Sequence, residues 1–138
     1  MKKILWCVDK SKFAGSNVEV VCELTRKLNA ELTLLHVVAM PLVIQPEVTY
    51  DPRPFLKAGE EFLNEIRSHV EKHGGKASVH LESTYGNAAH KIVEYAKKEG
   101  FDLIALGAMG ESEVKDLLLG SVAHTVARHA PCSVLIIR

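Results

Sequence analysis

Residues 102–121 read DLIALGAMGESEVKDLLLGS, and the glycines and the serine in this stretch have the spacing G-x-x-G-x9-G-S. The apolar run at residues 102–106 predicts a strand, and residues 121–130 predict a helix. Glycines let backbone N–H groups approach an anion without a Cβ in the way, and the first N–H groups of a helix have no partner within it. The stretch therefore predicts a backbone site for an anion such as phosphate, between a strand and a helix N-terminus.

Strands and helices alternate on the amino-terminal side of this stretch, and one more strand follows it. Short apolar runs predict the other strands, at residues 4–8, 31–38, 76–85 and 132–137. Apolar residues at helical spacing predict helices at residues 18–28 and 55–73, and a third that Asn87 caps and that continues to Lys98. Ser11 or Ser16 is a candidate cap for the first helix. The element order is β-α-β-α-β-α-β-α-β.

This alternation predicts one domain over residues 1–138, an α/β fold in which helices cover both faces of a five-stranded parallel sheet. The expected strand order is 3-2-1-4-5, which makes a three-layer, Rossmann-like sandwich. Ligands of such sheets bind at the carboxyl ends of the strands where the order reverses, here strands 1 and 4. Asp9, after strand 1, and Gly107, after strand 4, are therefore expected to meet at one crevice.

Each candidate residue at this crevice also has a plain structural interpretation. Asp9 either caps the turn after strand 1 or accepts hydrogen bonds from a sugar or base. Ser121 is either the N-cap of the last helix or a hydroxyl donor to a phosphate. The backbone of Val37 would read an adenine edge, with Val8 and Val37 packing the base, but both valines would look the same as core residues.

Residues 39–54 contain four prolines and do not fit a regular helix. The segment is long for a loop within a compact domain, and long loops of this kind are often lids or binding loops.

Composition and spacing argue against several function classes. The 17 basic and 17 acidic side chains cancel, and no basic stripe indicates a nucleic-acid or membrane partner. No apolar stretch approaches the length of a membrane span, and the amino-terminal segment predicts a buried strand rather than a secretory signal. The cysteines, Cys7, Cys22 and Cys132, are odd in number and match no zinc pattern, and each lies in an apolar segment, which favours small buried apolar residues over a redox or metal role. Reduced thiols fit a cytoplasm. His69 and His73 would lie one helical turn apart, as a metal clip or, more simply, on an exposed face.

The chain resembles the universal stress protein family over its whole length. The matching segments are residues 3–9, 34–37, 102–107, the glycine motif through Val122, and the closing segment 128–136. The glycine motif is the one that marks the ATP-binding branch of the family. The resemblance implies an adenine-nucleotide α-hydrolase-like fold, a cytoplasmic stress-response protein, ATP with Mg²⁺ as ligand, and a homodimer formed through the last strand at residues 134–137.

The resemblance also implies roles for individual residues. Asp9 and Val37 would contact adenine or ribose, Gly107 would lie by the ribose, and the later glycines with the serine would hold phosphates. The complete set of candidate nucleotide contacts is Cys7, Val8, Asp9, Val37, Gly107, Met109, Gly110, Gly120, Ser121 and Val122.

The chain departs from the family pattern at several of these positions. Cys7 stands where proline is frequent, Val8 where threonine is common, and Ser133 where proline is usual. Ala108 and Met109 stand where Ser-His or Ser-Arg is frequent, which removes a hydroxyl and a polar side chain near the ribose and phosphates. The departures leave open an interaction module of the same fold that has lost the nucleotide. A slow ATPase, for which Asp9 is the one evident base, stays open as the enzyme alternative to a regulatory ATP-binding protein.

Overall fold

The computed structural model describes residues 1–10, 14–43, 45–108 and 119–138, and it contains the predicted parallel sheet. The strand order is β3-β2-β1-β4-β5, and every neighbouring pair is parallel. The predicted order 3-2-1-4-5 is therefore confirmed, and the five strands are β1 (Lys3–Cys7), β2 (Glu31–Ala39), β3 (Ala77–Thr84), β4 (Leu103–Gly107) and β5 (Ser133–Ile137).

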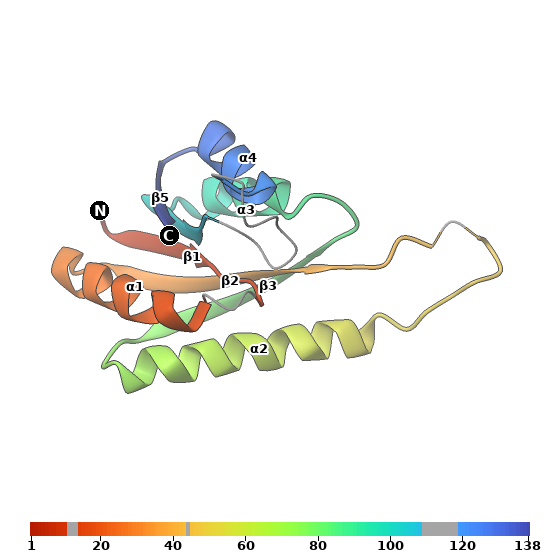
Figure 1. The fold of residues 1–138 in the computed structure, drawn as a ribbon, viewed down its shortest axis with the longest axis horizontal. Coiled ribbons are helices and arrows are strands. Elements are labelled where there is room, and N and C mark those ends of the chain that lie inside the picture. The colour runs from red at the N-terminus through yellow and green to blue at the C-terminus, as the bar shows by residue number, and fades with distance from the viewer. Residues whose placement is uncertain (11–13, 44, 109–118) are drawn as a thin grey trace.

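Within the described ranges, four helices cover the sheet, two on each face (Figure 1). They are α1 (Ala14–Leu28), α2 (Arg53–Lys72), α3 (Ala88–Glu99) and α4 (Ser121–His129). α1 and α2 pack on one face, and α3 and α4 pack on the other. The alternation of side chains along β1 divides its residues between the two layers, because successive side chains of a strand point to opposite faces. Ile4 and Trp6 belong to the α1–α2 core, whereas Leu5 belongs to the α3–α4 core.

The first helix begins earlier than the apolar spacing predicts. α1 starts at Ala14, so Ser16 lies within the helix and is not its cap, while Ser11 lies outside the described residues. The apolar pattern missed this first turn because Gly15 and Ser16 are poor helix formers in isolation.

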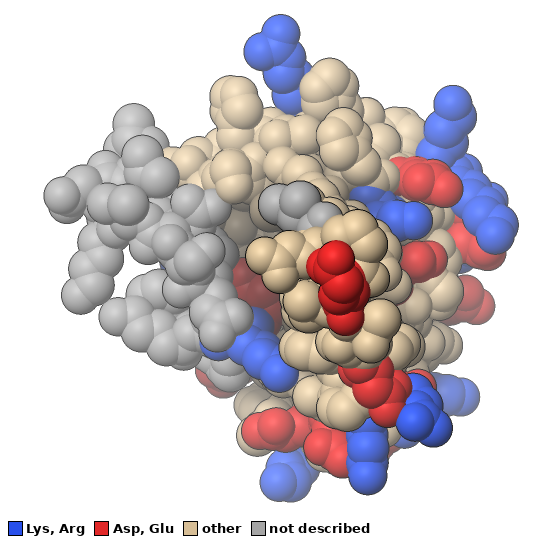
Figure 2. All heavy atoms as spheres, turned by 90° about the vertical axis from the view of Figure 1, so that its right-hand side faces the viewer, with Lys and Arg blue, Asp and Glu red and all other residues tan. Residues whose placement is uncertain are grey.

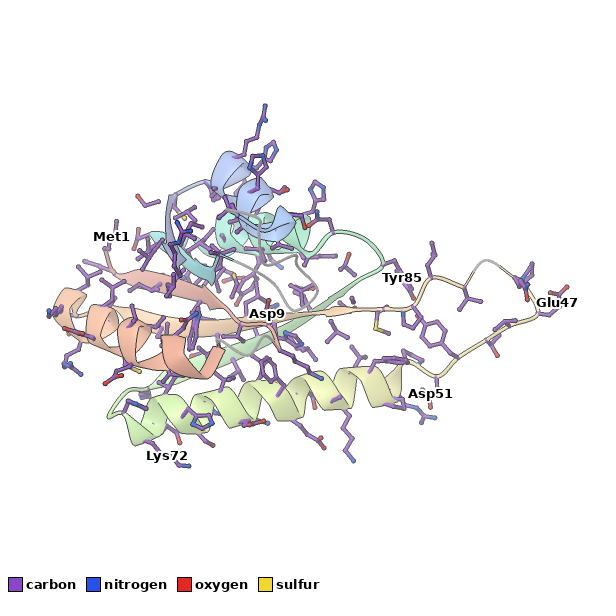
Figure 3. The ribbon with its side chains drawn as sticks, in the orientation of Figure 1. Met1, Asp9, Glu47, Asp51, Lys72 and Tyr85 are labelled. Carbon is purple, nitrogen blue, oxygen red and sulfur yellow. The ribbon has the colours of Figure 1, made fainter. Side chains whose placement is uncertain are left out.

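The proline-rich segment projects away from the rest of the molecule (Figure 1). It leaves the end of β2 at Met40 and enters α2 through Pro52, which occupies the N-cap position. Glu47 lies at its far end (Figure 3). No regular helix occupies its described residues up to Pro52, as predicted, but α2 begins at Arg53 and thus includes Pro54, which a first helical turn tolerates. Among the described residues, no helix is both long enough and apolar enough to cross a bilayer.

Replacing Asn87 by alanine is expected to lower the free energy of unfolding by about 1 kcal/mol. Asn87 is the N-cap of α3, and its Oδ1 accepts a hydrogen bond of 2.7 Å from the backbone N–H of Ala89, as the sequence predicts. Urea unfolding followed by circular dichroism measures the loss. Asn64→Ala, at an exposed site within α2, is the control and should change stability by less than about 0.5 kcal/mol. Equal losses in both variants would show that the cap contributes nothing of its own.

Candidate functional site

A pocket lies at the carboxyl ends of β1, β2 and β4, where the strand order reverses. It encloses about 90 Å³ and is open to solvent on one side. We call it the switch-point pocket; its lining is Cys7, Val8, Asp9, Leu35, His36, Val37, Ala88, Ile92, Leu106, Gly107, Gly120, Val122 and Ala123. The predicted meeting of Asp9 with Gly107 is thus found, since both line this pocket.

One wall of the pocket is built from the ends of β1 and β2. The backbone N–H of Val8 donates to the carbonyl of Leu35 over 2.8 Å, which continues the pairing of the two strands one residue beyond Cys7. Val8 is 5% exposed and packs in the α1–α2 core. Asp9, the next residue, is half-buried and lies at the end of β1 near the middle of the sheet (Figure 3).

The opposite wall is built from the end of β4 and the start of α4. The backbone N–H of Ala108 donates to the carbonyl of Ile137, and the N–H of Gly120 donates to the carbonyl of Ala108 over 2.6 Å. The first bond continues the pairing of β4 with β5, and the second ties the start and the end of the glycine stretch together, so that α4 begins beside the end of β4. Met109 and Gly110, two of the predicted contacts, lie outside the described residues.

The prediction that Ser121 caps α4 is wrong. Gly120 occupies the N-cap, with φ −68° and ψ 164°, and Ser121 is the first helical residue. A glycine has no side chain with which to cap, so no side chain satisfies the N-cap position of α4. The first N–H groups of this helix and the positive end of its dipole are therefore suited to an anion at the pocket. Ser121 is exposed, and the neighbouring Val122 lines the pocket in its place.

Several lining residues were not among the sequence candidates. α3 contributes Ala88 and Ile92, which face the pocket from its first two turns. Together with Leu35 and Leu106 they make one side of the pocket apolar. Nothing in the sequence pattern distinguishes these residues from ordinary core positions.

The sequence candidates for the pocket also lack His36. The sequence places it within a predicted strand, which suggests no special role. In the structure it lines the pocket, and its Nδ1 lies 2.9 Å from the carbonyl oxygen of Val8.

The cysteines are not prepared for thiolate chemistry. Burial raises the pKa of the Cys7 thiol far above its ordinary value, and the neighbouring Cys132 raises it further. Burial also raises the pKa of the other two thiols. Cys7 therefore presents a protonated, weakly polar sulfur to the pocket. The interpretation as buried apolar residues holds for Cys22, whereas Cys7 and Cys132 are half-buried.

No metal centre is evident in the part of the chain that the structure describes, where no three His, Cys, Asp or Glu residues are grouped to hold an ion. His69 and His73 lie at the end of α2, and the Nδ1 of His73 donates to the backbone carbonyl of His69 over 2.9 Å. The Nδ1 atom of His73 therefore has a hydrogen-bond partner in the backbone of α2 and does not require a metal.

Figure 2 views the molecule from the side of the carboxyl ends of the strands. Lysine, arginine and acidic side chains gather along the lower and right-hand parts of this face, and both signs are interspersed. No field of one sign covers the described part of the face, so an anion bound here would be held by local hydrogen bonds rather than by a basic surface. The arrangement of the switch-point pocket suits a ligand with a flat apolar part and an anionic part.

Comparisons with known proteins agree with the fold and bear on this pocket. Residues 1–138 match the model of the universal stress protein family. The chain is 33% identical over 149 residues to universal stress protein YxiE of Bacillus subtilis (strain 168), which covers 99% of this chain and 98% of that protein. The structure is similar to that of universal stress protein UspA from Lactobacillus plantarum, with a TM-score of 0.82 and 27% identity over 99% of this chain and 97% of that one.

Three further structures of similar fold hold adenine nucleotides. A universal stress protein from Archaeoglobus fulgidus in complex with dAMP has a TM-score of 0.74 and 22% identity over 100% of this chain and 98% of that one. A universal stress protein in complex with cAMP has a TM-score of 0.75 and 22% identity, with coverages of 99% and 97%. A family protein from Arabidopsis thaliana with AMP bound has a TM-score of 0.68 and 18% identity, with coverages of 99% and 91%.

Proposed function

Because this chain belongs to the universal stress protein family, we propose that it binds ATP in the switch-point pocket and acts as a nucleotide-dependent regulator of a stress response. The observation that carries the proposal is the geometry of that pocket. Apolar residues of β2 and α3, the start of α4 with a glycine at its N-cap, and Asp9 all line it. The apolar residues suit the base of a nucleotide, the helix N-terminus suits its phosphates, and the carboxylate of Asp9 suits its ribose.

The base is proposed to lie against the apolar side of the pocket. Val37 and Ile92 offer half-buried and buried apolar surface there, and Val8 and Cys7 close the inner end. The backbone groups of Val37 would read the edge of adenine. The half-buried Asp9 would accept hydrogen bonds from the ribose hydroxyls, with Gly107 alongside.

The phosphates are proposed to lie on the glycine stretch. Gly120 and Val122 line the pocket, and the backbone N–H groups at the start of α4 would donate to phosphate oxygens. Ser121 would add its hydroxyl, and Met109 and Gly110 would complete this part of the site. The adenine nucleotides in three structures of similar fold support the class of ligand, and the G-x-x-G-x9-G-S spacing supports the longer phosphate chain of ATP.

The residues of the pocket also bear on Mg²⁺. Asp9 is the only carboxylate among the lining residues that the structure describes, and Mg²⁺ commonly binds through one or two carboxylates together with substrate phosphates and water. A magnesium ion that accompanies ATP would therefore be held chiefly by phosphate oxygens and water, and it would neutralise part of the phosphate charge.

The protein is further proposed to be a cytoplasmic homodimer that joins through β5 and has no nucleic-acid partner. β5 is an edge strand whose pairing in the described sheet is with β4, and its central residues are apolar and half-buried. An edge strand of this kind leaves one row of backbone groups for a second chain. Light scattering coupled to size exclusion should give the mass of a dimer, and a monomer at micromolar concentrations would contradict this part of the proposal.

Calorimetry of the purified protein with ATP tests the main proposal. We expect ATP, AMP and cAMP to bind, ATP the most tightly because its phosphates reach the start of α4, and GTP to bind more weakly because the backbone reads adenine. The supernatant of heat-denatured protein should also be analysed for nucleotide that has copurified. If neither ATP nor AMP binds at millimolar concentration and none copurifies, the nucleotide function is excluded, and an interaction module of the same fold becomes the better hypothesis.

A further inference from the structure

The ring of His36 makes a defined hydrogen bond to the backbone at the exit of β1. His36 is 9% exposed, and its Nδ1 lies 2.9 Å from the carbonyl oxygen of Val8. A carbonyl oxygen can only accept a hydrogen bond, so Nδ1 carries the hydrogen and donates it. In the neutral ring this bond selects the tautomer that carries its hydrogen on Nδ1.

Both backbone groups of Val8 are held by neighbouring residues of β2. The N–H of Val8 donates to the carbonyl of Leu35 over 2.8 Å, and the carbonyl of Val8 accepts from the His36 ring. The two bonds fix the peptide units on either side of Val8. The second of these units is the one that leads into Asp9, so the direction in which the chain leaves β1 depends on the His36 ring.

Helix α2 in turn holds the ring of His36 in place. The rings of His36 and Phe62 meet edge to face, with centroids 4.9 Å apart and planes at 65°. Gly59 lets α2 lie close at this point, because a Cβ there would be 2.7 Å from Val38 Cγ2 and 3.5 Å from His36 Cδ2. The ring therefore has little freedom to turn away from the Val8 carbonyl.

We propose that His36 is a positioning residue for the nucleotide, an inference that rests on the nucleotide function proposed above. By holding the Val8 carbonyl, His36 fixes the place at which Asp9 enters the switch-point pocket, so that the carboxylate meets the ribose without reordering of the backbone at Val8 and Asp9. The bond reduces the entropy that this backbone would lose on binding, which is how a preorganised site gains affinity. His36 acts through Val8 and Asp9, with no bond to the ligand required.

Two substitutions separate the hydrogen bond from the packing of the ring. In His36→Asn, the side-chain amide nitrogen takes the position of Nδ1 relative to Cα and keeps a donor for the Val8 carbonyl, while most of the ring is lost. In His36→Leu, apolar volume is kept and the donor is lost. We expect His36→Leu to bind ATP about ten-fold more weakly, because one hydrogen bond is lost and the backbone at Val8 is less firmly held. His36→Asn should bind ATP within about three-fold of the unsubstituted protein.

A destabilised variant serves as the control for a purely structural role. Val70 is fully buried under the other end of α2, away from the switch-point pocket, so Val70→Ala lowers stability without touching the Val8 carbonyl. Its affinity for ATP should be unchanged at temperatures where the protein is folded. If the affinities of the three variants simply follow their stabilities, or if His36→Asn loses as much affinity as His36→Leu, the positioning role is overturned.

The tautomer of His36 can be measured without any nucleotide. Nitrogen-15 NMR at a pH where the ring is neutral should show the hydrogen on Nδ1, and a hydrogen on Nε2 would overturn the inference.

The two proposals fail in different ways. Unsubstituted protein that binds no adenine nucleotide defeats the proposed function, whereas unsubstituted protein that binds ATP while His36→Leu binds it equally well defeats this inference alone.

Discussion

Replacing Gly120 by valine is expected to abolish ATP binding while the protein stays folded. Gly120 is buried at the N-cap of α4 and lines the switch-point pocket. Its φ of −68° and ψ of 164° are ordinary for any residue, so the backbone can accept valine without strain. What valine adds is a branched side chain at the place where the phosphates are proposed to approach the backbone. We expect the affinity to fall by at least about a hundred-fold, which corresponds to about 2.8 kcal/mol, because the valine side chain would occupy the place proposed for the phosphates.

The effect on folding should be much smaller than the effect on binding. Valine is a poor N-cap compared with glycine, and a cost of about 1 kcal/mol in the free energy of unfolding is expected. Calorimetry with ATP and urea unfolding of the same sample measure both quantities. Gly86→Val is the matched control, because Gly86 is exposed and a Cβ there would have no heavy atom within 4 Å. If Gly120→Val bound ATP within a few-fold of the unsubstituted protein, the phosphates would have to lie elsewhere.

The largest loss of stability is expected for Trp6→Ala. Trp6 is 1% exposed on the central strand β1, and it packs in the α1–α2 core. Removing a large aromatic side chain from a closely packed core costs about 3–5 kcal/mol, since both the transfer free energy and the cavity contribute. Domains of this size are stable by about 5–15 kcal/mol, so the variant should be close to unfolding at physiological temperature.

Urea unfolding followed by far-ultraviolet circular dichroism measures this loss, because Trp6 is the only tryptophan and its fluorescence disappears with it. Val20→Ala is the control: Val20 lies on the same layer but is 46% exposed, and its truncation should cost less than about 0.5 kcal/mol. A Trp6→Ala protein within 1 kcal/mol of the unsubstituted chain would mean that the core around β1 collapses to fill the space.

Much of the fold could be predicted from the sequence because hydrophobic periodicity and helix caps depend on residues that are close together in the chain. The strand order followed from short apolar runs that alternate with helical spacing, since such runs must be covered on both faces. Asn87 was recognisable as the cap of α3 because a cap depends on a few neighbouring backbone groups. The pairing of Asp9 with Gly107 at one pocket followed from the strand order alone. Their contact with a nucleotide remains a prediction.

Other features escaped prediction because they depend on contacts between distant parts of the chain. The spacing identified a glycine and a serine at the start of α4, but only the structure shows that the glycine takes the N-cap, where its N–H donates to the carbonyl of Ala108. The apolar residues of α3 that line the pocket look like core residues in the sequence. Gly59 gave no local signal, because its need for a hydrogen in place of a side chain arises from Val38.

The order of the strands and the meeting of Asp9 with Gly107 at one edge of the sheet therefore follow from the sequence, because both depend on hydrophobic periodicity. The glycine spacing adds backbone groups for an anion, which stay a prediction. The tertiary structure decided which side chains complete the pocket and what holds them. His36 is the clearest case: the sequence shows a histidine in a strand, whereas its bond to Val8 exists only because β2 lies beside β1 and α2 packs against the ring. Side-chain hydrogen bonds are short-ranged and directional, so they are set only when the packed layers bring the partners within about 3 Å.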